Sequence, residues 1–146
     1  MADHLDGFRA LDKQLAELAD PKATGSVLRS GAGYAMRRVA KQAKAEAPVG
    51  RAAHRTYKGR LVAPGFAARS VRVVTKLSRD KQKVSAVLGV RKEAFYALQF
   101  IELGTSHVPA KPWLVPTFER NQRQIITDIK AGMVRRLAKI VAMRRQ

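Results

Sequence analysis

The spacing of apolar residues changes twice along this chain, and that change restricts the fold more than any other feature of the sequence. Residues 4–19 place leucine and phenylalanine at steps of three and four, which predicts an amphipathic helix. A second helix is expected over 24–46, where small alanines share one face. Helical spacing returns over 117–144, and Thr117 is the expected cap of this long helix.

Between these helices the apolar residues alternate, as they do in half-buried strands. Residues 66–77 and 82–90 are rich in valine, and a polar turn joins them, which predicts an antiparallel hairpin. The predicted fold class is therefore α+β: a small antiparallel sheet packed by the N-terminal helix pair and the long C-terminal helix. The 146 residues fit a single domain, 1–146.

Three connecting segments have signatures of their own. Residues 51–65 are basic, show no hydrophobic period, and are expected to form a long loop that is the most mobile internal segment. Residues 92–103 fit either a strand or a short helix, and a helix is favoured. Residues 108–116 hold three prolines and the only tryptophan, which predicts an extended, rigid segment.

The charge of the chain is large and unevenly distributed. The 29 lysines and arginines exceed the 11 acidic residues by 18. Residues 1–20 carry a net charge of −3, residues 21–91 carry +15, residues 92–118 are neutral and residues 119–146 carry +6. This pattern fits contact with nucleic-acid phosphates, or a head-to-tail association in which the acidic part of one copy meets a basic part of the next. A basic surface that is merely solvated is the third interpretation.

The density of positive charge in the middle of the chain identifies the candidate phosphate contacts. Aromatic residues are only 6% of the sequence, so contacts to the backbone of a nucleic acid are expected rather than to base edges. The first candidates are Arg51, Arg55, Lys58, Arg60, Arg69 and Arg72, and the next are Arg37, Arg38 and Lys41.

No pattern typical of catalysis or metal binding is present in the sequence. There is no cysteine, and His4, His54 and His107 lie far apart without ligand spacing. No glycine-rich loop carries the lysine of a phosphate-binding motif. We therefore expect no enzymatic activity, no cofactor and no metal. The start lacks the apolar region of a signal peptide, and no apolar stretch approaches the ~20 residues of a membrane span, so no membrane is expected as a partner.

Several short motifs occur in an informative order. Ala-Lys-x-x-Ala-Pro (43–48) ends the second predicted helix, Phe-Tyr-Ala-x-x-x-x-Glu-x-Gly-Thr spans 95–105, and Pro-Ala-Lys-Pro-Trp-Leu-x-Pro spans 109–116. In this order the chain resembles the small neck proteins of long-tailed phages and prophages, the head–tail joining or tail-completion family founded on the tenth gene product of a lambdoid coliphage. The matching positions are Tyr96, Glu102, Gly104, Thr105, Pro112, Leu114 and Pro116, and Trp113 replaces the usual phenylalanine.

Physical chemistry assigns parts of this motif a structural role. Gly104 allows a sharp turn with positive φ, and Glu102 needs a cation or backbone N–H groups as partners if it is even partly buried. Trp113 and Leu114 could anchor their segment in a groove of a neighbouring copy. Alternatively, the same segment packs on its own domain.

The resemblance implies a structural virion protein, present in the host cytoplasm before assembly. It would form a homohexameric ring at the head–tail junction, as a tail terminator or an adjacent neck ring, and join the connector or stopper to the tail tube. Packaged double-stranded DNA would occupy the lumen, faced by the basic candidates above. The alternative is a free nucleic-acid-binding protein without sequence specificity, of a nucleoid-like or ribosomal kind.

Overall fold

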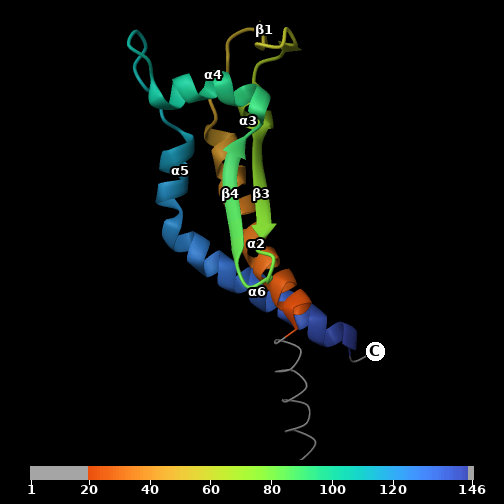
Figure 1. Cartoon of the computed structure of the whole chain (residues 1–146). Helices are drawn as coiled ribbons and strands as arrows, with labels where there is room; N and C mark the ends of the chain where they lie inside the picture. Colours follow the sequence, from red (N-terminus) through yellow and green to blue (C-terminus); the bar gives the residue numbers. More distant parts are fainter. Residues whose placement is uncertain (1–19, 145–146) are drawn as a thin grey trace, which may run out of the picture.

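The computed structural model describes residues 20–144 and confirms the α+β class (Figure 1). The first predicted helix, 4–19, lies outside the described residues. In chain order the elements are α2 (Pro21–Glu46), β1 (His54–Arg55), β2 (Leu61–Val62), α3 (Phe66–Ser70), β3 (Val71–Leu77), β4 (Val84–Val90), α4 (Lys92–Leu103), α5 (Leu114–Arg120) and α6 (Gln122–Arg144).

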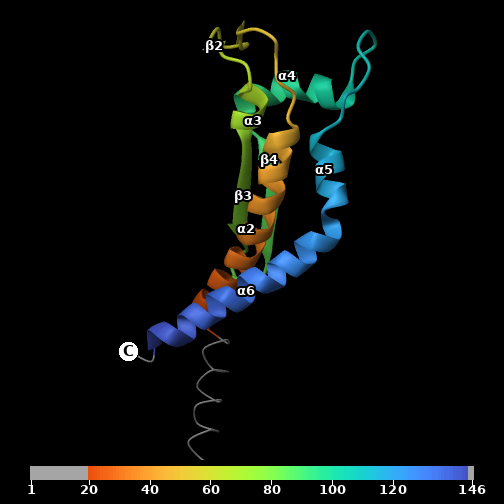
Figure 2. The same ribbon diagram turned by 180° about the vertical axis from the view of Figure 1, so that it is seen from behind.

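Helix α2 is the middle of three layers, with the β3–β4 hairpin on one side and α6 crossing the other (Figure 1, Figure 2). The expectation that the C-terminal helix packs on the hairpin is therefore wrong, because α6 packs on α2 instead. Two glycines permit this crossing. A Cβ atom added to Gly132 would stand 2.9 Å from the Cα atom of Gly31, so the two helix backbones are in direct contact.

Helix α2 begins three residues before the predicted start. Asp20 is its N-cap, and the Asp20 carboxylate accepts a hydrogen bond from the Lys22 N–H at 2.9 Å. Pro21 occupies the first helical position, where no amide donor is needed. As predicted, the buried face is made mostly of small side chains, which lets the hairpin and α6 approach closely from two sides.

The predicted hairpin is confirmed in part. Strands β3 and β4 pair antiparallel over all seven residues of each. Residues 66–70, predicted as the start of the first strand, instead form the short helix α3. Gly65 precedes it with a φ of 81°, and the Ser70 hydroxyl donates to the Phe66 carbonyl oxygen at 2.7 Å. A single helical turn and a short strand cannot be distinguished by periodicity.

The basic segment 51–65 was expected to be a loop without regular structure, and this expectation is wrong in part. Strands β1 and β2 form a small antiparallel ladder within it. The Thr56 hydroxyl donates a hydrogen bond at 2.8 Å to Glu93, which ties this segment to α4. Its mobility stays a prediction.

The helices of the last third of the chain agree with the prediction in part, because the single helix predicted over 117–144 is divided in two. The helix favoured over 92–103 is confirmed as α4, but α5 begins at Leu114 and a break at Asn121 separates it from α6. Thr117 is therefore no cap. It is fully buried inside α5, where its hydroxyl lies 2.6 Å from the Trp113 carbonyl oxygen and 2.6 Å from a carboxylate oxygen of Glu46.

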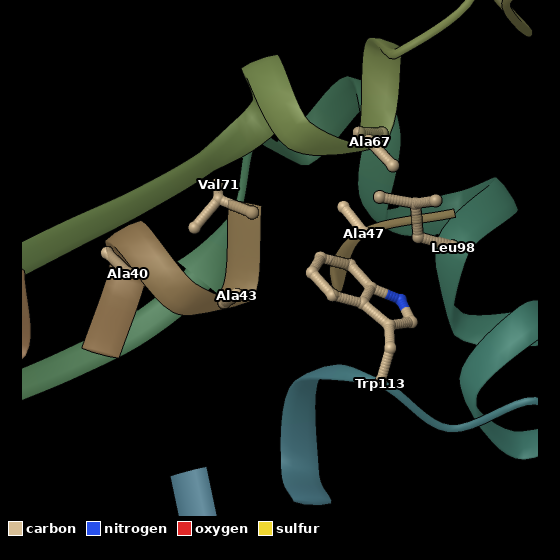
Figure 3. Packing of buried hydrophobic residues seen from close by; sticks show 8 residues of the cluster. Ala40, Ala43, Ala47, Ala67, Val71, Leu98 and Trp113 are labelled. Atoms are coloured by element: carbon tan, nitrogen blue, oxygen red, sulfur yellow. The ribbon is translucent and has the colours of Figure 1, made fainter. Parts of the chain in front are cut away.

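Trp113 fills the core at the end of the molecule that carries α4 (Figure 3). Only 7% of its surface is exposed. The other buried residues of this core cluster come from α2 and its C-cap, α3, β3 and α4: Ala40, Ala43, Ala47, Ala67, Val71, Ala94 and Leu98. Of the two interpretations of Trp113, the structure supports packing on its own domain, whereas residues 108–112 of the proline-rich segment are exposed. The side chain of Trp113 is not free to enter a neighbouring groove.

Candidate functional site

A groove follows the junction between α2 and β3, and we call it the basic groove. It consists of two adjoining hollows of about 520 and 430 Å³, which share Gly33, Arg37 and Thr75 in their walls. No Asp, Glu or aromatic side chain lines either hollow. Eight basic residues do: Lys22, Arg29, Arg37, Lys41, Lys44, Arg72, Lys81 and Arg136.

The cations of the basic groove have no carboxylate partner within the described chain. Among residues 20–144, the ion pairs within 4.0 Å are Arg38–Asp128, Arg60–Glu93 and Arg120–Glu46, all outside the groove. Like charges along one hollow, next to a low-dielectric protein wall, produce a focused positive potential. The basic groove is therefore suited to a polyanion.

The length of α2 along the basic groove is close to one turn of a duplex. The helix rises about 33 Å between Lys22 and Lys44, at 1.5 Å per residue, and one turn of B-DNA is roughly 34–36 Å long. Arg72 and Lys81 extend from the hairpin side, and Arg136 reaches from α6, where its Nε donates to the Ser26 hydroxyl at 2.8 Å. A phosphate backbone lying in the groove would meet charges from three elements.

The predicted phosphate contacts divide between two places. Arg37, Lys41 and Arg72 lie together in the basic groove. Arg51, Arg55, Lys58 and Arg60 are exposed on the segment that carries β1 and β2, beyond α3 and α4 (Figure 1). The structure therefore does not bring all the candidates onto one surface.

Four of the predicted residues make contacts within the chain. In the β1–β2 segment, Arg60 pairs with Glu93 at 3.7 Å, and Arg55 donates to the Gly59 carbonyl oxygen at 2.9 Å. Arg38 turns away from the groove and pairs with the buried Asp128 of α6 at 2.9 Å, which fixes α6 to α2. Arg69 donates from both terminal nitrogens to the carbonyl oxygens of residues 63–64, at 2.8 and 2.9 Å. The guanidinium groups of Arg38 and Arg69 serve the fold of their own chain.

Five residues of the basic groove were not among the candidates: Lys22, Arg29, Lys44, Lys81 and Arg136. A signal for one of them was present in the sequence. Arg37, Lys41 and Lys44 are spaced by four and three residues, which places them on one side of a helix. Lys81 and Arg136 carried no such signal, because their place depends on how the hairpin and α6 pack.

The Glu-x-Gly-Thr motif fixes the start of α5. Glu102 is half-buried near the end of α4, and its carboxylate accepts hydrogen bonds from the backbone N–H groups of Trp113, Leu114 and Val115 at 2.8, 3.1 and 2.8 Å. These donors have no partner within a helix, and α5 has no side-chain cap of its own. The expectation that Glu102 needs backbone N–H partners is confirmed.

Gly104 and Thr105 form the turn that returns the chain from α4 to α5. Gly104 has a φ of 74°, as expected, and a Cβ atom there would stand 2.7 Å from the Ala110 backbone nitrogen. The Thr105 hydroxyl oxygen accepts hydrogen bonds from the N–H groups of His107 and Val108 at 3.3 and 3.1 Å. The folding of this chain alone thus accounts for these two motif positions.

The remaining motif residues differ in exposure. Tyr96 is exposed on α4 and makes an edge-on contact with Phe100, with 5.5 Å between ring centroids. Pro112 is exposed and immediately precedes Trp113, whereas Pro116 lies in the first turn of α5. The predicted extended segment therefore ends at Trp113, and Pro116 stands where a helix tolerates proline.

Glu46 joins the end of α2 to α5. A hydrogen bond from the Thr117 hydroxyl, and then one from Arg120, hold the pKa of the Glu46 carboxyl below its ordinary value of 4.5. The ionised carboxylate is thus the form that the folded chain stabilises.

Residues 20–144 include no group of three or more His, Cys, Asp or Glu side chains placed to hold a metal ion. No helix in this part of the chain is long and apolar enough to cross a membrane. Comparisons with protein families, with curated proteins and with solved structures give no match to this chain.

Proposed function

We propose that this chain is a structural, non-enzymatic virion protein that forms a ring at the head–tail junction of a long-tailed phage or prophage. The ring is a homohexamer that joins the connector or stopper to the tail tube, with packaged DNA in its lumen. The observation that carries the contact with DNA is the basic groove, with eight cations and no carboxylate in its walls. The motif resemblance is the basis for the place in the virion.

The chemistry of the groove supports contacts to phosphates without sequence specificity. Its polar walls are lysine, arginine, serine and threonine, and it contains no aromatic ring or amide side chain that could stack on or read a base. A lumen that must let any packaged sequence pass requires this kind of contact. The exposed cations of the β1–β2 segment are the second set of candidates for the lumen.

The salt dependence of duplex binding tests this contact. The triple variant Arg37→Gln, Lys41→Gln and Arg72→Gln removes three charges from the groove. Its matched control, Arg123→Gln, Lys130→Gln and Lys139→Gln, removes three exposed charges from α6. Each lost phosphate contact reduces the magnitude of the slope of log K against log salt by about 0.9. The slope of the groove variant should therefore be smaller in magnitude by about 2.7.

The control variant should keep the native slope. Equal losses in the two variants would mean that total charge, and not the groove, determines binding. The alternative function, a free nucleic-acid-binding protein, predicts the same groove effect but a chain that stays monomeric or dimeric on DNA. The mass of the DNA-bound complex therefore separates the two functions.

A further inference from the structure

An apolar groove lies at the opposite end of α2 from Asp20, where α4 crosses the molecule (Figure 1). Its volume is about 440 Å³, and its walls include Val49, Phe66, Phe100, Ile101 and Val108. Val49 is 71% exposed and Val108 is 54% exposed, so no part of residues 20–144 covers them. We call this the apolar groove.

Exposed apolar surface continues from this groove onto α4. Phe100 belongs both to the groove wall and to the edge-on contact with Tyr96, and Phe95 and Leu103 are also exposed on this helix. Exposed apolar side chains gathered beside a groove in this way are typical of a site for a protein partner. An amphipathic helix laid into a groove is one of the recurrent ways in which such a surface is covered.

The chain itself contains a segment with the matching pattern. Residues 4–19 carry an apolar stripe for which the sequence predicts an amphipathic helix, and they lie outside the described residues. The stripe consists of Leu5, Phe8, Leu11, Leu15 and Leu18.

Length prevents this segment from reaching the groove of its own chain as a helix. The segment joins the fold at Asp20, whereas the groove begins beside Ala47, at the far end of the 26-residue α2. That separation is about 39 Å, and a helix over 4–19 is only about 24 Å long. The groove that it can enter belongs to another copy.

Charge is compatible with the same pairing. Residues 4–19 carry a net charge of −1, from three acidic and two basic residues, whereas the walls of the apolar groove include Lys111 and His54 but no carboxylate. The acidic residues of α4 do not line the groove, because the Glu93 carboxylate is bonded to Thr56 and the Glu102 carboxylate to the start of α5. An amphipathic segment with a small negative net charge would thus meet a groove whose walls contain no opposing carboxylate.

We infer that the apolar groove receives residues 4–19 of a second copy of this chain. Each copy then has one donor segment and one acceptor groove, which gives a head-to-tail contact that closes into a ring when the rotation between copies permits. This inference names the contact between copies in the ring of the proposed function. It rests on the proposed function only for the closure of that contact into a ring. It does not depend on DNA.

The experiment measures association of the purified full chain without DNA, by native mass spectrometry. The groove variant carries Val49→Glu and Val108→Glu at exposed positions, and the segment variant carries Leu11→Glu and Leu15→Glu. The control variant carries Ile126→Glu and Val134→Glu on the exposed side of α6. Thermal melting of each variant, followed by circular dichroism, establishes that it remains folded.

We expect the native chain and the control variant to associate, and the groove and segment variants to be monomeric when alone. An equimolar mixture of these two variants retains one intact groove and one intact segment, so it should form 1:1 dimers that grow no further. A monomeric native chain, association of either variant alone, loss of association in the control, or a mixture that stays monomeric would overturn the inference. Because DNA is absent, this result does not depend on whether the basic groove binds phosphates. The salt dependence of DNA binding likewise does not depend on whether the apolar groove receives residues 4–19.

Discussion

Alanine at Gly31 and alanine at Gly33 should change stability in opposite directions, although both glycines are buried in α2. Alanine is favoured over glycine inside a helix by about 1 kcal/mol, and this gain is common to both sites. At Gly31 a Cβ atom would stand 2.6 Å from the Met133 side chain and 2.8 Å from the Ile129 carbonyl oxygen of α6. Overpacking of this kind costs roughly 1–3 kcal/mol.

At Gly33 the first atom met by a Cβ is a terminal nitrogen of Arg37, at 3.1 Å. That side chain is exposed and flexible, so it can move at little cost. We therefore expect Gly31→Ala to lower the free energy of unfolding by up to about 2 kcal/mol, and Gly33→Ala to raise it by up to about 1 kcal/mol. Urea denaturation followed by circular dichroism measures both. Shifts of the same sign and size would refute the backbone contact between α2 and α6.

Three further predictions concern the α4–α5 end of the molecule. Trp113→Ala should cost roughly 3–5 kcal/mol of folding free energy in the isolated chain, measured by urea denaturation; an unchanged midpoint would contradict its place in the core. Glu102→Ala leaves three N–H groups of α5 without their acceptor and should cost about 2 kcal/mol, with Glu102→Gln intermediate; equal stability of all three chains would disprove the capping role. Because the pKa of Glu46 is lowered in the folded state, its contribution is complete above pH 4.5 and is lost as the pH falls through the lowered pKa. Acid titration of Glu46→Gln should therefore show a smaller loss of stability below pH 4.5 than the native chain, and identical acid unfolding curves would contradict the prediction.

The periodicity of the sequence was sufficient to predict the long elements, because a stripe over many residues averages out exceptions. It could not reveal local events that depend on single residues. The break at Asn121 does not interrupt the apolar spacing, so α5 and α6 were predicted as one helix. Thr117 has the chemistry of a cap, but the Glu102 carboxylate replaces that function from another helix. Such long-range capping has no signal in the local pattern.

Charge density along the chain was enough to select three of the eight basic residues of the groove. These are Arg37 and Lys41, which are neighbours on α2, and Arg72 of β3. Density could not show that Arg38, the adjacent residue, points to the other side and pairs with Asp128. It also could not select Arg136, which joins the groove only because α6 crosses α2 at the glycine contact.

The most direct test of the proposed function is electron cryomicroscopy of the purified chain assembled on a short duplex. We expect a closed ring, with DNA density through its centre and the basic groove between α2 and β3 turned toward that density. A single copy bound to DNA without a ring would contradict the proposal and favour a free nucleic-acid-binding protein. A closed ring with the basic groove on its outer surface would contradict the assignment of the groove to the lumen.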